Sequence, residues 1–238
     1  NVHRIEGGGT EFPMMIHDGS ASQGLIVHEL GHNYVMGMLA NNEWKEGWLD
    51  EGFTSFQTTL FFESQQRGMD GFANLEPFIT GLDLDGRSEP TSLVSQYYRD
   101  FNTYNSTIYA RGELFFHQLR YIVGDVALRR IMRTYFDRWK LKHVSEEAFK
   151  QVAEEVSGMD LSTYFGQGLH SVELYDYAVG RVKTGKAGGG GPEAGGGGSG
   201  SLRPPAYSRP ARSASNSGIA LTREKACASS PVLASSTR

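Results

Sequence analysis

Two histidines four residues apart, inside one predicted helix, constrain this chain more than any other feature. Apolar residues recur at helical spacing from about residue 22 to residue 40, which predicts an amphipathic helix. His28-Glu29-Leu30-Gly31-His32 lies within it and fits the pattern H-E-x-x-H. Because positions i and i+4 share one face of a helix, both imidazoles can point at one ion. Glu29 stands beside the first of them and is suited to take a proton from a water at that ion.

Zinc in catalytic sites is held by three protein ligands and keeps a fourth position for water. One long pattern supplies the third ligand as a histidine six residues after the second, but Met38 occupies that position and excludes it. Glu51 follows His32 after eighteen intervening residues. If a second helix begins near residues 48–51, a short loop can return Glu51 to the same ion. We therefore predict one zinc ion held by His28, His32 and Glu51.

The rest of the pattern predicts a mainly helical chain with strands at its ends. Helical spacing recurs at about 105–122, 125–140 and 145–157, and a short helix is expected to end near residue 169. Residues 11–17 are expected to form an edge strand, because Pro13 argues against a central one. Residues 174–183 are a candidate closing strand. The predicted fold class is mainly α (α+β), with a short β segment at the N-terminal edge.

Composition changes sharply near residue 187. Residues 1–186 hold 17 Lys and Arg against 25 Asp and Glu, and they contain the large apolar side chains that build a core. Residues 187–238 hold 6 against 2 and are rich in Gly, Ser, Ala and Pro, so we expect a folded domain followed by a low-complexity, disordered tail. The basic residues of the tail are scattered without aromatic neighbours, and no nucleic-acid partner is predicted.

Other general features exclude few classes. Cys227 is the only cysteine, so neither a disulfide framework nor a thiolate zinc site is expected. No apolar run approaches the roughly 20 residues that span a membrane. No targeting signal is predicted in this chain, and its localisation and oligomeric state stay open.

The gap of eighteen residues and the segment Trp48-Leu49-Asp50-Glu51-Gly52-Phe53 resemble the gluzincin peptidases of the aminopeptidase N type. The resemblance spans about residues 5–180 and implies a thermolysin-like catalytic domain within 1–186. Members of this group carry a preceding β-rich domain, so the resemblance also implies that the domain is truncated at its N-terminal side. By the same resemblance His28, His32 and Glu51 are zinc ligands and Glu29 is the base.

Two further segments resemble motifs of that group. Tyr109-Ala110-Arg111-Gly112 is similar to a Tyr-x-Lys-Gly segment, with Arg in place of Lys, which implies that Tyr109 donates to the oxyanion of the reaction. Residues 8–12, Gly-Gly-Thr-Glu-Phe, are similar to a Gly-x-Met-Glu-Asn segment, with Thr and Phe as departures. That similarity implies substrate binding by Gly8, Gly9 and Glu11, with Glu11 pairing with the free amino terminus of a peptide.

The function that these patterns favour is removal of N-terminal residues from peptides by a zinc aminopeptidase. A thermolysin-like endopeptidase and an epoxide hydrolase of the same superfamily are alternatives. An alternative of another class is a non-catalytic peptide-binding module that retains zinc. Two neighbouring residues also stay open: Asp50 either orients an imidazole or caps a helix at the surface, and Tyr104 is expected to line the cleft.

Overall fold

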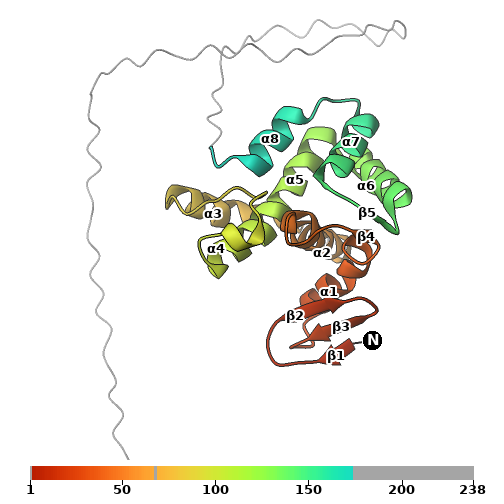
Figure 1. Cartoon of the computed structure of the whole chain (residues 1–238), viewed down its shortest axis with the longest axis vertical. Helices are drawn as coiled ribbons and strands as arrows, with labels where there is room; N and C mark the ends of the chain where they lie inside the picture. The colour runs from red at the N-terminus through yellow and green to blue at the C-terminus, as the bar shows by residue number, and fades with distance from the viewer. Residues whose placement is uncertain (1, 67–68, 174–238) are drawn as a thin grey trace, which may run out of the picture. The chain divides into compact units, whose positions relative to one another are not determined.

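The computed structural model describes residues 2–66 and 69–173. It is mostly helical, with a small sheet at the N-terminal side (Figure 1). The helices are α1 (Gln23–Val35), α2 (Phe53–Gln65), α3 (Gly71–Leu84), α4 (Phe101–Asn105), α5 (Gly112–Val123), α6 (Asp125–Trp139), α7 (Glu146–Ser157) and α8 (Ser162–His170). The predicted fold class is confirmed. The predicted domain boundary at residue 187 and the closing strand at 174–183 lie outside the described residues.

The N-terminal sheet contains β1 (Val2–Arg4), β2 (Gly9–Phe12) and β3 (Met15–Asp18) in the order β1-β3-β2. The single edge strand predicted for residues 11–17 is wrong. Pro13 and Met14 form the turn between β2 and β3, and Met14 has a φ of 66°. A proline cannot donate to a ladder hydrogen bond, so it sits between the strands rather than within one. The sheet thereby leaves β2 at its edge.

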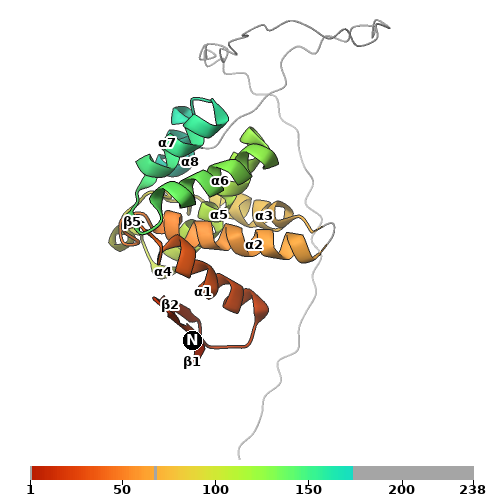
Figure 2. The same ribbon diagram turned by 90° about the vertical axis from the view of Figure 1, so that its right-hand side faces the viewer.

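Helices α1 and α2 pack side by side, and Figure 2 shows α1 lying between the sheet and α2. The prediction that α1 continues to residue 40 is wrong, because the helix ends at Val35. Gly37 N donates to His32 O at 2.7 Å, and residues Leu39–Ala40 form strand β4, which pairs with β5 (Lys142–His143). The pairing of β4 with β5, about a hundred residues later in the chain, thus prevails over the helical spacing of apolar residues near residue 40.

An aromatic core joins the helices that follow. Its fully buried aromatic members come from the turn directly before α2, from α2 itself, and from α5, α6, α7 and α8: Trp48, Phe56, Phe115, Phe116, Tyr135, Phe149 and Phe165. The Phe116 ring stacks on Phe53 with a centroid distance of 4.7 Å and contacts Phe149 at 5.6 Å. Each such side chain contributes about 1.5–3 kcal/mol by burial alone. This core fixes α5 against α2.

Two segments of the helical part wind as π-helix: η1 (Trp48–Gly52), directly before α2, and η3 (Ser106–Arg111), directly before α5. The helix predicted over about 105–122 is therefore present, but its first turns are wider than an α-helix. Such π segments are rare in proteins overall, but those that occur often lie at functional sites. Here η1 carries Glu51 and η3 carries Tyr109. In the part of the chain that the structure describes, none of the helices has the length and apolar character to cross a membrane.

Candidate metal centre

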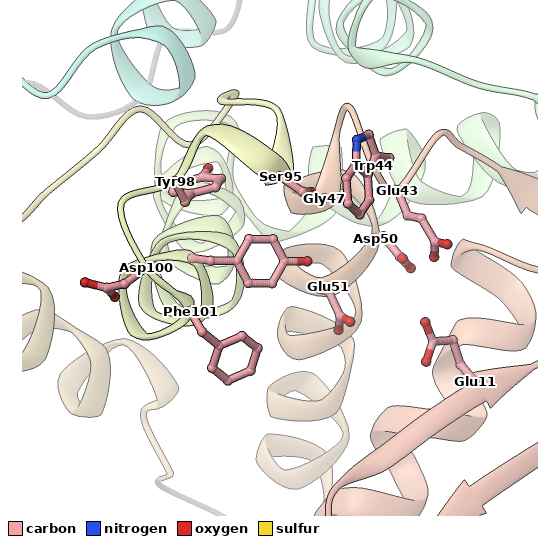
Figure 3. A pocket seen from close by; sticks show the side chains of 11 residues that line it. Glu11, Glu43, Trp44, Gly47, Asp50, Glu51, Ser95, Tyr98, Asp100 and Phe101 are labelled. Atoms are coloured by element: carbon pink, nitrogen blue, oxygen red, sulfur yellow. The ribbon is translucent and has the colours of Figure 1, made fainter.

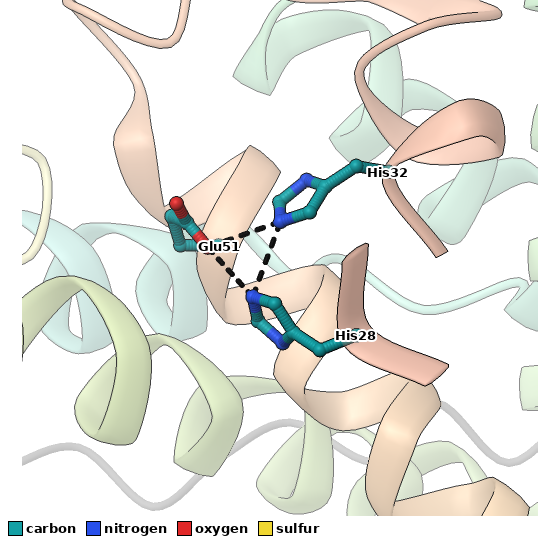
Figure 4. Close-up of side chains that lie close together, drawn as sticks. All are labelled: His28, His32 and Glu51. Carbon is teal, nitrogen blue, oxygen red and sulfur yellow. Dashed lines mark hydrogen bonds and ion pairs between the residues drawn. The ribbon is translucent and has the colours of Figure 1, made fainter. Parts of the chain in front are cut away.

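Three ligand atoms from two helical segments converge on one point. His28 Nε2 lies 3.0 Å from Glu51 Oε2 and 3.1 Å from His32 Nε2, and His32 Nε2 lies 3.2 Å from Glu51 Oε2 (Figure 4). The two histidines project from one face of α1, as their spacing predicts. Glu51 comes from η1, which returns to α1 through the loop after β4. The structure thus brings together the three residues that the sequence predicts as ligands.

This triangle fits a zinc ion. Zinc–nitrogen and zinc–oxygen bonds of about 2.0–2.1 Å in a tetrahedron place neighbouring ligand atoms about 3.3 Å apart. The three distances here, 3.0 to 3.2 Å, are close to that value. His32 Nδ1 lies 2.7 Å from Asp50 Oδ1. When Nδ1–H donates a hydrogen bond to this carboxylate, the lone pair of Nε2 is directed at the centre. Asp50 is 1% exposed, so it orients an imidazole and is not a surface cap.

The charges around the centre are strongly coupled. Burial raises the pKa of Glu51, but hydrogen bonds from His28 and His32 outweigh it and lower the pKa to about 2. Burial lowers the pKa of His32, and hydrogen bonds to Asp50 and Glu51 outweigh that effect and raise it to about 10. Zinc binds imidazole in its neutral form, so we expect occupancy of the centre to depend on pH.

Glu29 lies beside the centre on α1 and is only 5% exposed. Its Oε2 atom has no hydrogen-bond partner among the described residues. Burial raises the pKa of Glu29 to about 7, against the opposing effect of His28 and His32. A carboxylate with a pKa near neutrality and a free oxygen is suited to accept and return a proton.

Tyr109 reaches the same centre from η3. Its hydroxyl donates to Glu51 Oε1 at 2.6 Å, and its ring stacks on His28 with a centroid distance of 5.8 Å and an interplanar angle of 18°. Burial raises the pKa of Tyr109 above its usual range, and the neighbouring Glu51 carboxylate acts in the same direction. The phenol therefore keeps its proton and remains a donor.

A cleft of about 460 Å³ opens beside these residues. Figure 3 shows Glu11 of β2 facing Asp50 and Glu51 across it. Tyr104 lines the cleft, as predicted. The lining also includes residues that sequence reasoning missed, among them Glu43, Trp44 and Phe101. They lie on loops and a short helix without a periodic pattern, so no signal in the sequence pointed to them.

The predicted substrate-binding glycines lie in and next to β2. Gly9 packs against the Glu29 side chain so closely that a methyl group on Gly9 would overlap its carboxylate. Gly8 has a φ of 57° and its carbonyl accepts a hydrogen bond from Gly19 N at 2.8 Å. Both glycines therefore have a structural reason to be glycine, and their contact with substrate stays a prediction.

Comparison with known proteins places the chain in a family. The model of the peptidase family M1 domain matches residues 14–167, which is more than half of the sequence. The chain belongs to peptidase family M1. The matched range includes His28, Glu29, His32, Glu51 and Tyr109, and it begins after Gly8, Gly9 and Glu11.

Two curated relatives and one solved structure illustrate the similarity of this M1 domain. Aminopeptidase N of Caulobacter vibrioides is 30% identical over 172 residues, which cover 67% of this chain and 20% of that protein. Aminopeptidase B of Rattus norvegicus is 25% identical over 134 residues, covering 52% and 21%. A mutant M1 zinc metallopeptidase of Deinococcus radiodurans, bound to a Tyr-Ser-Ala substrate, superposes with a TM-score of 0.62 at 23% identity over 74% of this chain and 40% of that one.

These matches confirm the predicted resemblance to the aminopeptidase N type and the fold of the M1 catalytic domain. The matched part of this chain spans about a fifth of the length of these curated relatives. Membership of this family implies a zinc requirement, while the number of ions and the ligand set stay predictions for this chain.

Proposed function

We propose that this M1 domain binds one zinc ion through His28, His32 and Glu51 and removes N-terminal residues from peptides. The observation that carries the proposal is the convergence of three ligand atoms within 3.0 to 3.2 Å of one another. A buried carboxylate, Glu29, and a phenol donor, Tyr109, adjoin the same point. The names of the curated relatives, aminopeptidase N and aminopeptidase B, support the same reaction class.

Zinc bound at this centre would polarise the scissile carbonyl and lower the pKa of a water molecule. Glu29 then takes a proton from the attacking water and passes it to the leaving amine. Burial, which raises the pKa of Glu29, favours a group that can both accept a proton and return it. Its Oε2 atom has no hydrogen-bond partner among the described residues and is therefore available to accept this proton.

Tyr109 supplies a second stabilising contact. When the carbonyl carbon becomes tetrahedral, its oxygen gains negative charge, and a phenol that keeps its proton can donate to it. In the structure the Tyr109 hydroxyl donates to Glu51 Oε1 at 2.6 Å. Transfer of this hydrogen bond to the substrate oxygen is the role that we propose for it.

Glu11 is the proposed receptor for the amino terminus of the peptide. It lines the cleft, and its carboxylate lies with His32 and Asp50 in a cluster whose ligand atoms are within 4.8 Å of one another. An ammonium group placed there pairs with Glu11 and holds the first peptide bond near the metal centre. The Tyr-Ser-Ala substrate of the Deinococcus radiodurans relative is a short peptide of the kind that we propose for this chain.

Hydrolysis of aminoacyl anilides and of N-blocked peptides by the zinc-loaded chain tests this function. We expect the free aminoacyl substrates to be cleaved and the blocked ones to resist. Cleavage of only the blocked peptides would indicate a thermolysin-like endopeptidase instead. Turnover of a lipid epoxide, with neither peptide cleaved, would indicate the epoxide hydrolase alternative, and peptide binding without any turnover would indicate a binding module.

A further inference from the structure

Two glycines bring the π segments η1 and η3 into backbone contact. Gly52 is the last residue of η1, and Gly112 directly follows η3. A Cβ atom added to Gly52 would lie 2.7 Å from Gly112 Cα, and one added to Gly112 would lie 2.9 Å from Gly52 Cα. Both distances are shorter than a real Cβ atom tolerates. The two backbone segments therefore touch at a point where neither has room for a side chain.

Backbone conformation does not explain these glycines. Gly52 has φ and ψ of −65° and −40°, and Gly112 has −60° and −45°, which are ordinary helical values open to any residue. Alanine would even favour the helix at both positions by its intrinsic propensity. The requirement for glycine is therefore one of close approach alone.

The contact lies next to residues that matter for the proposed reaction. Glu51 precedes Gly52, and Tyr109 stands three residues before Gly112. The hydrogen bond of 2.6 Å from Tyr109 Oη to Glu51 Oε1 thus joins two segments whose backbones meet directly. An extra methyl group would move η3 away from η1 by a fraction of an ångström or more and carry the Tyr109 hydroxyl with it.

A side-chain anchor holds η3 to another neighbour. The guanidinium of Arg111 pairs with the Asp83 carboxylate of α3 and donates to Ser88 Oγ at 2.7 Å. The Arg111 and Asp83 side chains are 15% and 13% exposed, so the pair is largely shielded from water. Tyr109 is two residues away on the same π turn, and its backbone is therefore restrained by the glycine contact and by this ion pair.

We propose that Gly52, Gly112 and Arg111 are positioning residues that set the place of the Tyr109 hydroxyl at the metal centre. This inference rests on the role proposed for Tyr109. It predicts that each of the three acts through Tyr109, so that changing one of them has no further effect once the Tyr109 hydroxyl is gone.

The test is a double-mutant cycle in zinc affinity, measured by chelator competition on the full chain. Tyr109→Phe removes the hydrogen bond to the Glu51 ligand, and loss of such an outer partner is expected to weaken zinc binding by about tenfold. Gly112→Ala and Gly52→Ala are expected to weaken it by a similar factor. Each combined with Tyr109→Phe should bind no worse than Tyr109→Phe alone. Fully additive losses, or a glycine variant with unchanged affinity, would overturn the positioning role.

Two further variants keep the test decisive. Arg111→Gln adds no bulk to the Gly52–Gly112 contact, so it tests the same coupling if the alanine variants fail to fold, as judged by circular dichroism. Gly166→Ala is the matched control, because a Cβ there meets nothing within 4 Å and its helix, α8, lies outside the centre. It should leave zinc affinity unchanged.

Activity separates this inference from the proposed function. If the chain cleaves aminoacyl anilides, Gly112→Ala should lower kcat about as much as Tyr109→Phe while KM changes little. If the chain binds zinc but cleaves nothing, the proposed function fails, and the zinc cycle still decides the positioning role. A wild-type chain that binds no zinc would overturn both.

Discussion

The helical wall of the cleft, meaning η1, η3 and α5, is closely packed, whereas the strand wall opposite, meaning β1, β2 and β3, is more exposed. Trp48 of η1, Ile108 of η3 and Phe116 of α5 are each 0% exposed. On the strand side, Val2 is 64% and Phe12 48% exposed. The residues proposed for bond cleavage thus stand on or next to the core, and the residue proposed for the amino terminus, Glu11, stands on a lightly supported edge strand. The residues proposed for bond cleavage are therefore held by the packed core more firmly than the residue proposed to bind the amino terminus.

Glu29 lies where the two walls meet. It belongs to α1, yet its carboxylate is covered by the Gly9 backbone of β2. The strand wall therefore contributes to the burial that raises the Glu29 pKa to about 7. The comparison can be tested by changing one residue at a time on each side of the cleft.

Glu29→Gln should have the largest effect, because it removes the proton acceptor and keeps the shape. General-base catalysis contributes about 10²- to 10⁴-fold, so kcat should fall by that range while the bound zinc is unchanged. Glu147→Gln on the exposed start of α7 is the matched control and should be neutral. Full activity of Glu29→Gln would remove this residue from the reaction.

Phe116→Ala should destabilise the helical wall by about 3–5 kcal/mol, since it empties a fully buried site among aromatic neighbours. Phe12→Ala on the strand wall should cost much less, about 0.5 kcal/mol, because the side chain is half exposed. Urea unfolding of both variants measures the difference. Equal losses would show that the two walls are equally well supported.

Tyr109→Phe should lower kcat by about 10²- to 10³-fold, the usual effect of removing one oxyanion donor. The fold should be unaffected, because the ring keeps its stacking on His28. Tyr34→Phe is the control, as Tyr34 lies on the exposed side of α1 and is 53% exposed. A change in KM alone would place Tyr109 in substrate binding rather than in the reaction.

Glu11→Gln should act on substrate capture. Loss of a charged hydrogen bond to the α-ammonium corresponds to about 10- to 100-fold in kcat/KM for unblocked substrates, mostly through KM. The strand wall itself should stay folded, because the Glu11 side chain lines the cleft and the pairing of Glu11 with Ile16 in the sheet is through the backbone. An equal loss for blocked and unblocked peptides would contradict the role of Glu11 as the receptor for the amino terminus.

The sequence predicted which residues converge at the candidate metal centre better than it predicted the elements around them. His28 and His32 share a helix, and a four-residue spacing dictates their common face. Asp50 was ambiguous, because its burial depends on a π turn that no periodicity reveals. The end of α1 and the hairpin at Pro13-Met14 were predicted wrongly, since long-range pairing of β4 with β5 and the turn geometry of Met14 decide them.

His28, His32 and Glu51 are proposed to hold one zinc ion. Elemental analysis of the purified, dialysed chain and of its Glu51→Ala variant, with Glu147→Ala as control, tests this proposal most directly. We predict about one zinc per chain for the wild type and the control, and almost none for Glu51→Ala. A wild-type chain without zinc, or a Glu51→Ala variant that keeps its full zinc content, would contradict the account.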